Sequence, residues 1–268
     1  MRLIDSHCHL QADRFDPDVD EVVARAQAAG VERILVPGWD LESSTAAVAL
    51  AARHPWLDVA VGIHPHDAAR ADAAAWQGIA RLAGDHRVAA LGETGLDYDR
   101  MFSPAGAQRD NLRRHLELGQ ELDKPVVLHC RSTAGSSAAH DDLLAELDRA
   151  GIDAGGGGRH GPPAVLHSFS GSTAFAEQAL ARGLAISISG LVFRAGEAST
   201  AVVVVAVPAD RLLVETDSPF LSSPGAPRRR NEPEWVRVTA AWVAERRGEA
   251  GDAPGEALVR AYDRTFRR

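Results

Sequence analysis

The sequence predicts an α/β fold, a single-domain (β/α)8 TIM barrel over residues 1–268. Short apolar runs rich in β-branched residues alternate with longer amphipathic runs, as expected for repeated strand–helix units. Eight strands can be counted, which is the number that closes this barrel. A chain of 268 residues also suits one such barrel. An open doubly wound sheet is less favoured, because no G-x-G-x-x-G motif follows the first strand.

The expected strands are short runs dominated by Val, Ile, Leu and Ala. In chain order they are Leu3–Ser6, Arg33–Val36, Val59–Gly62, Val88–Gly92, Val126–His129, Ala164–His167, Ala185–Ser189 and Leu212–Glu215. Residues Gly155–Pro163, just before the sixth strand, are expected to form a surface loop insertion, because glycine dominates the stretch Gly155–Gly158.

Amphipathic periodicity predicts helices between most of these strands. They are Pro17–Ala29, Leu41–Arg53, Ala73–Ala83, Ala107–Leu122, Asp141–Ala150, Ser172–Arg182 and Glu232–Arg247. In the first helix, Asp16 can cap the start, Pro17 suits the first turn and Gly30 suits the exit. Ala201–Val207 has strong strand propensity, but the alternation requires a helix there before the eighth strand. A final helix over Gly255–Tyr262 is expected on the outside.

Composition excludes several classes of protein. The formal net charge is −8, which does not fit a strongly basic nucleic-acid binder, so a phosphate-bearing substrate would be met by local cations or metals. Two cysteines, Cys8 and Cys130, do not make a disulfide framework and are expected to pack as small apolar groups. The start MRLIDSHCHL does not resemble a signal peptide, and no window suits a membrane span. A cytoplasmic protein without membrane association is the simple expectation.

Metal-ligating side chains fall where the predicted strands end. His7 and His9 lie two residues apart in an extended segment, so both point to the same side. Other strands end at residues of the same chemistry, namely Glu93, His129, His167 and Asp217. Because the carboxyl ends of barrel strands converge on one face, these six side chains are expected to meet there.

The ligand set indicates two metal ions rather than one. Taken singly, each residue has an ordinary structural alternative, since Glu93 could cap a turn and Asp217 could cap a helix. Together they exceed the three ligands that a catalytic zinc ion typically takes from a protein. A carboxylate with two oxygens can bridge two ions, which explains why Glu93 ends an otherwise apolar run. Mixed imidazoles and carboxylates suit Zn²⁺, Mn²⁺, Fe²⁺ or Co²⁺, and Mg²⁺ less naturally.

Six motifs occur in order along the chain: DSHCHL, GIHPH, GETGLDY, LHSFSG, ETDSPFL and RNEP. Together they resemble the TatD family of metal-dependent hydrolases, within the amidohydrolase-like barrels, from Leu3 to about Ala244. The resemblance implies a two-metal site. In it, His7, His9 and Asp217 would hold one ion, His129 and His167 the other, and Glu93 would bridge. It also implies a deoxyribonuclease, often a 3′–5′ exonuclease, acting on DNA or another phosphodiester.

Some segments depart from the family pattern. After His129 the family usually carries Arg and then an acid, whereas this chain reads RSTAGSSAAHDDLL. The C-terminal helix of the family usually carries an Asn before its last aromatic residue, whereas AYDRTFRR has none. The differences concern the substrate pocket and the chain end, not the six ligands.

Further candidates for substrate contact lie in the loops of the same face. His64 could donate to a substrate phosphate or be a structural histidine fixed by Pro65, and His66 is expected behind the ligands. For Asp97, in the loop after Glu93, a local turn role is favoured over catalysis, and its position at the rim leaves substrate contact open. Arg131 could bind phosphate or pair with a nearby acid. Arg228, in the run Arg228–Arg230, could contact a phosphate backbone, although such runs are usually only solvated.

The expected chemistry is attack on the substrate by a water molecule whose pKa is lowered because it lies between two divalent ions. Asp217 is expected to orient that water and take its proton. A phosphodiesterase acting on nucleic acid is the leading hypothesis. A hydrolase of a small amide, lactone or phosphoester is the second. A catalytically silent, metal-stabilised binding protein is the third.

Overall fold

The apolar runs form parallel strands that pair in the order of the chain, from β1 to β8. The computed structural model describes residues 1–154, 163–194, 198–227 and 229–266. Within these ranges the strands are β1 Leu3–Asp5, β2 Val31–Pro37, β3 Leu57–Val61, β4 Val88–Asp97, β5 Val126–Arg131, β6 Ala164–Leu166, β7 Ala185–Ile188 and β8 Leu212–Val214. The last strand returns to the first, because the Ser6 amide donates to the Val214 carbonyl at 3.0 Å. The sheet thus closes as the predicted (β/α)8 barrel.

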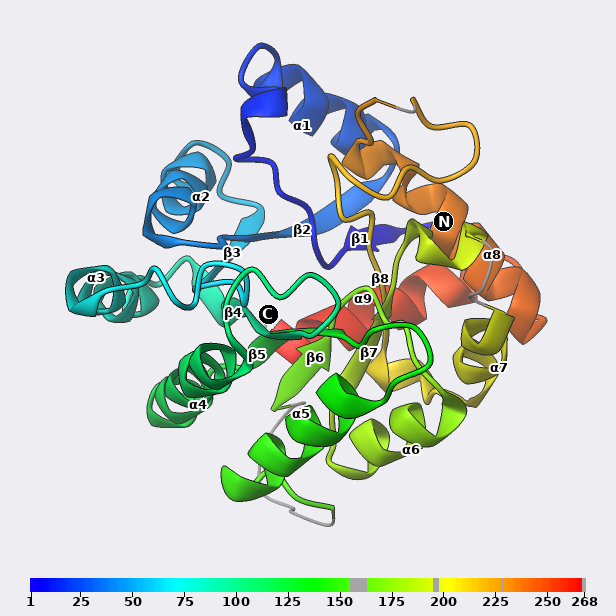
Figure 1. Ribbon diagram of the computed structural model, residues 1–268. Coiled ribbons are helices and arrows are strands. Elements are labelled where there is room, and N and C mark those ends of the chain that lie inside the picture. The colour runs from blue at the N-terminus through cyan, green and yellow to red at the C-terminus, as the bar shows by residue number, and fades with distance from the viewer. Residues whose placement is uncertain (155–162, 195–197, 228, 267–268) are drawn as a thin grey trace.

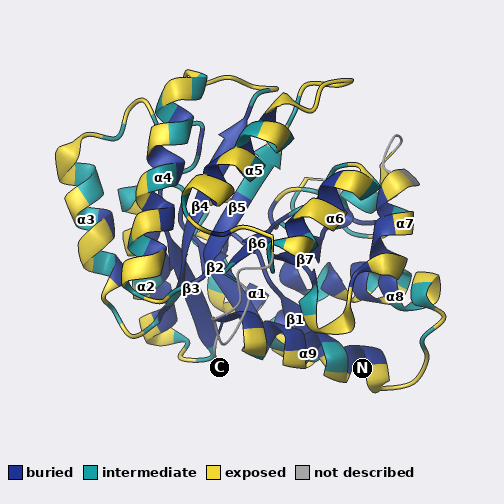
Figure 2. Ribbon diagram, turned by 90° about the horizontal axis from the view of Figure 1, so that it is seen from below, coloured by how far each residue is buried: buried dark blue, intermediate teal, exposed yellow. Residues whose placement is uncertain are grey.

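Helices surround this sheet in the order of the strands (Figure 1). They are α1 Val19–Ala28, α2 Leu41–Arg53, α3 Ala73–Ala83, α4 Ala105–Glu121, α5 Ala138–Arg149, α6 Thr173–Ala181, α7 Ala198–Ala206, α8 Val236–Arg247 and α9 Ala253–Phe266. Figure 2 shows buried strands inside and helices whose outer sides are exposed. Parallel strands covered on both sides must be apolar throughout, which explains why the strand runs do not alternate with polar residues.

The first helix starts later than the sequence predicts. Asp13–Phe15 form a 3-10 turn, and the Asp16 amide donates to the Asp13 carbonyl within it. The helix therefore begins after Asp18, and the predicted capping role of Asp16 is wrong. The exit is confirmed, since Gly30 takes a φ of +89° just beyond the helix end, a conformation that favours glycine.

The ambiguous segment over Ala201–Val207 is helical, because α7 spans Ala198–Ala206. The final helix is longer than predicted and also lies differently. It contacts β1 and β8, and the Tyr262 hydroxyl donates to Asp58 at the start of β3, at 2.9 Å. Helix α9 therefore crosses the N-terminal ends of the strands, opposite the face where the predicted ligands lie, instead of lying only on the outside of the barrel.

Two expectations concern the chain as a whole. The predicted loop insertion at Gly155–Pro163, with its glycine run Gly155–Gly158, falls almost entirely outside the described residues. Among the described residues, no helix combines the length and the apolar character needed to cross a bilayer. The cytoplasmic location stays a prediction. Cys8 is fully buried and Cys130 partly buried, and both are free thiols.

A buried histidine on α4 makes folding stability sensitive to pH. His115 Nδ1 donates to the Asn111 carbonyl at 2.8 Å, and Nε2 accepts the Ile63 amide at 3.1 Å, so the neutral ring satisfies both partners. Burial lowers the pKa of His115 to about 4. The unfolded chain takes up this proton near pH 6.5, but the folded chain does not, so the free energy of unfolding falls as pH drops from 6.5 to about 4.

The loss attributable to His115 should reach roughly 3 kcal/mol across that window. Urea unfolding of the wild type and of His115→Gln at several pH values between 7 and 4.5 measures it. The Gln variant should start less stable and show a shallower pH dependence. Equal losses in the two proteins would contradict this assignment.

Candidate metal centre

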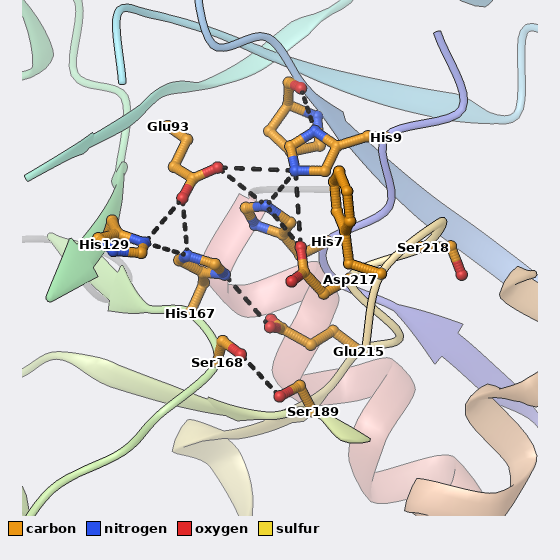
Figure 3. Close-up of polar contacts among 12 residues, drawn as sticks. His7, His9, Glu93, His129, His167, Ser168, Ser189, Glu215, Asp217 and Ser218 are labelled. Atoms are coloured by element: carbon orange, nitrogen blue, oxygen red, sulfur yellow. Dashed lines mark hydrogen bonds and ion pairs between the residues drawn. The ribbon is translucent and has the colours of Figure 1, made fainter. Parts of the chain in front are cut away.

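The predicted ligands meet at one mouth of the barrel, where the strands end (Figure 3). His7 and His9 follow β1, and His167 follows β6 directly. Glu93 and His129 differ from prediction, because both lie inside strands: β4 continues to Asp97 and β5 to Arg131. The β4–β5 pairing resumes at Thr94 and runs to the end of both strands, which extends β4 well past its predicted end.

A break in the register of β4 sets the position of Glu93. The pairing with β5 is irregular between Leu91 and Thr94, and Gly92 and Glu93 occupy this bulge. Gly92 has a φ of +107°, and a Cβ atom there would lie 2.5 Å from the Val127 carbonyl oxygen. Glycine is therefore required beside the glutamate, and the bulge re-aims the Glu93 side chain toward the cluster of histidines.

The Glu93 carboxylate lies among imidazoles on both of its oxygens. Oε2 lies 3.2 Å from His7 Nε2 and 3.7 Å from His9 Nε2. Oε1 lies near three other rings, at 2.8 Å from His167 Nε2, 3.1 Å from His129 Nδ1 and 3.2 Å from His64 Nε2. The two oxygens therefore face two different sets of histidines.

Asp217 lies on the β1 side of the cluster. Its amide donates to the His7 carbonyl at 2.9 Å, which ties the loop after β8 to the segment after β1. Asp217 Oδ1 lies 3.6 Å from His9 Nε2 and 3.8 Å from His7 Nε2. The structure thus brings Asp217 together with both histidines of the HxH pair.

The tautomer of His9 suits a cation bound between His9, His7 and Asp217. His9 Nδ1 donates to the Pro37 carbonyl at 3.0 Å, so Nε2 of the neutral ring carries a lone pair. His9 Nε2 lies 3.2 Å from His7 Nε2, and its lone pair faces the Asp217 carboxylate. A lone pair that faces a carboxylate in this way suits a bound cation, and a backbone carbonyl that fixes the ring is typical of metal-ligating histidines.

Electrostatics keeps the acids ionised. Burial raises the pKa of Glu93, but the imidazoles of His167, His64 and His7 outweigh burial and hold the pKa well below its usual range. Burial likewise raises the pKa of Asp217, and His9 and His7 reverse the effect. Burial lowers the pKa of His64 to about 4. Burial lowers the pKa values of His9, His129 and His167, but the neighbouring carboxylates outweigh it and raise them. At neutral pH the two ionised carboxylates therefore favour positive charge beside them, which a bound cation would supply.

Glu215 is a buried acid of the cluster that the sequence analysis missed. Its Oε1 lies 3.3 Å from His167 Nδ1, and its Oε2 has no hydrogen-bond partner among the described residues. Glu215 thereby fixes the ring of His167 from behind. The spacing that placed His7 and His9 on one side also applies to Glu215 and Asp217 in ETDSPFL, and could have indicated this residue.

Asp97 combines the predicted turn role with a role in the cluster. Its Oδ1 accepts the amides of Asp99 and Arg100, which shapes the turn after β4. Its Oδ2 lies 2.7 Å from His66 Nε2 and 3.4 Å from His129 Nε2. Asp97 is thus a carboxylate that contacts both His129 and His66.

Two arginines of this face form ion pairs within the protein. Arg131 is half exposed and pairs with Asp99, with Arg131 Nε 3.1 Å from Asp99 Oδ2. This is the predicted alternative in which Arg131 pairs with a nearby acid. Arg230 pairs with Asp18 and Glu232. Arg228 lies outside the described residues.

Within the described part of the chain, three groups of side chains have donor atoms close enough to share a cation, and within each group these atoms lie within 4.8 Å of one another. They are His7 with His9 and Asp217, His64 with Glu93 and His129, and His7 with His167 and Glu215. Mixed imidazole and carboxylate donors of this kind suit divalent transition ions. The residues present therefore fit the predicted metal centre.

Comparison with known proteins agrees with this geometry. A sequence model of the family described as TatD related DNase matches residues 4–267. A protein of Cronobacter sakazakii named 3′-5′ ssDNA/RNA exonuclease TatD is 40% identical over 253 residues, covering 92% of this chain and 91% of the relative. The Bacillus subtilis protein YabD, named an uncharacterized metal-dependent hydrolase, is 35% identical over 91% of this chain and 90% of its own.

Among solved structures, the Escherichia coli K12 protein YjjV, described as a TatD homolog, superposes with a TM-score of 0.88 at 29% identity. The match covers 100% of this chain and 98% of the other. A family match over nearly the whole length and relatives above 30% identity lead to one assignment. This chain is a member of the TatD-related DNase family.

Proposed function

We propose that this TatD-family hydrolase removes nucleotides from the 3′ end of single-stranded DNA or RNA, using two divalent metal ions. The observation that carries the proposal is the Glu93 carboxylate, whose two oxygens face separate sets of histidines at the barrel mouth. The relatives named exonucleases support a phosphodiester substrate over the amide or lactone alternative. The complete donor set speaks against a silent binding protein.

The arrangement supports a division of the ligands between two ions. His7, His9 and Asp217 would hold one ion, on the side of Glu93 Oε2. His129 and His167 would hold the other, on the side of Oε1. Glu93 would bridge. Zn²⁺ or Mn²⁺ fits these mixed donors better than Mg²⁺ does.

When bound, such ions lower the pKa of a coordinated water and stabilise negative charge on phosphate oxygens. Asp217 would accept the proton of the attacking water, because its carboxylate lies at the mouth of the barrel and stays ionised at neutral pH. His64 would donate to a substrate oxygen. Asp97 and Glu215 would hold His129 and His167 in place, so that these rings do not turn during catalysis.

A labelled single-stranded oligonucleotide tests the proposal. Wild-type protein supplied with Mn²⁺, Mg²⁺ or Zn²⁺ should release mononucleotides from the 3′ end, and 5′-labelled fragments should shorten progressively. His129→Ala should lose at least about 100-fold in rate, because it removes one ligand and its partner contacts.

His86→Ala is the matched control, since His86 is exposed and lies before β4, at the opposite end of the barrel. It should retain the wild-type rate. Absence of nucleotide release with all three metals, or full activity in His129→Ala, would contradict the proposed function.

A further inference from the structure

Two exposed phenylalanine rings stand at the mouth of the barrel. Phe102 is 65% exposed and Phe220 is 48% exposed, whereas the described phenylalanines elsewhere are buried or partly buried. Exposing a phenyl ring to water forfeits the free energy that burying it would contribute. A ring kept in water beside a functional site therefore indicates a surface that something else covers.

The two rings lie on opposite sides of the metal centre. Phe102 is in the loop after β4 and Phe220 in the loop after β8, and these strands are four apart in an eight-stranded ring. Phe102 contacts His66 with ring centroids 4.7 Å apart, and Phe220 faces His9 at 6.1 Å. The cluster of imidazoles and carboxylates thus lies between them.

Positive charge accompanies one of these rings. The guanidinium carbon of Arg14 lies over the Phe220 ring, 5.3 Å from its centroid. Other arginines also lie over aromatic rings in this protein, but Phe220 in addition faces His9 of the histidine cluster. A flat ring beside a cation is the combination that binds a nucleobase together with its phosphate.

We propose that Phe220 and Phe102 stack on unpaired bases of the nucleic acid whose scissile phosphate lies over the metal centre. Phe220 and Arg14 form one contact and Phe102 the other, on the two sides of that phosphate. A paired base cannot stack in this way without leaving its duplex, so the two rings select single strands. The inference rests on the proposed function and adds the residues that recognise the substrate.

Binding and kinetics with two oligonucleotides test this inference. One is an oligothymidylate, and the other has the same backbone but abasic residues at its last three positions. Phosphorothioate-linked versions, which resist cleavage, give Kd by fluorescence anisotropy, and the ordinary versions give KM and kcat.

Phe220→Ala and Phe102→Ala should each raise Kd and KM for the base-bearing strand about 5- to 100-fold and leave kcat within about threefold. For the abasic strand the same variants should change Kd less than about twofold. Phe220→Tyr should stay close to wild type, because a tyrosine ring also stacks. Val202→Ala is the matched control, since Val202 is 60% exposed on α7, away from the mouth, and should leave Kd and KM unchanged.

The outcomes separate the two proposals. Wild-type protein that degrades the strand, while the Phe→Ala variants keep their Kd or lose it equally for the abasic strand, would overturn the stacking inference alone. In that case the two rings would contact a protein partner or have no binding role. Wild-type protein that neither binds nor degrades the strand would overturn both proposals.

Discussion

Replacing Glu93 by glutamine should lower kcat/KM on single-stranded DNA by at least about 10³-fold. The substitution keeps the size of the side chain but removes its charge, and one oxygen becomes an amide nitrogen that donates rather than accepts. Both Glu93 oxygens face imidazole nitrogens within 3.7 Å. Either orientation of the glutamine amide therefore places an N–H donor where a cation is proposed. Steady-state kinetics under saturating metal measures the loss.

Glu177→Gln provides the control for Glu93→Gln, because Glu177 is exposed on α6 and away from the cluster. It should keep the wild-type kcat/KM. Circular dichroism should show that Glu93→Gln remains folded, since the barrel core does not depend on this carboxylate. A Glu93→Gln protein within tenfold of wild type would contradict a bridging role.

Replacing Gly92 by alanine should destabilise the protein by roughly 4 kcal/mol, which corresponds to a fall in Tm of about 10 °C. The new Cβ atom would lie 2.5 Å from the Val127 carbonyl oxygen, at a φ of +107° that alanine avoids. The backbone of β4 must shift, and Glu93 shifts with it. Thermal unfolding followed by circular dichroism measures the change.

Gly106→Ala is the matched control for Gly92→Ala. Gly106 lies in the first turn of α4, and a Cβ atom there would meet nothing within 4 Å. Its replacement should leave stability unchanged or raise it by up to about 1 kcal/mol. A Gly92→Ala protein as stable as Gly106→Ala would show that the β4 bulge does not need glycine.

The barrel and the convergence of the six side chains are predictable from the sequence, because both follow from one regularity. Parallel strands joined by helices place all their carboxyl ends on one face, so His7, His167 and Asp217 could be grouped without coordinates. The ambiguous Val-rich segment could be assigned to a helix for the same reason, since the alternation requires one.

The features that were missed depend on registry or on loop geometry. The end of β4 was placed too early because the bulge at Gly92 interrupts the apolar pattern, although pairing with β5 resumes beyond it. The start of α1 was misplaced because a local 3-10 turn competes with the cap at Asp16. The contact of Asp97 with His129 joins two strands, and no periodicity along one segment reveals it.

Metal content tests the central claim most directly. Wild-type protein, stripped with a chelator and then dialysed against Zn²⁺ or Mn²⁺, should retain two divalent ions per chain by elemental analysis, while His7→Ala and His129→Ala should each retain about one fewer. The proposed division of ligands predicts this pattern, because the two histidines lie on different oxygens of Glu93. Protein that retains no divalent ion with every histidine intact would contradict the account.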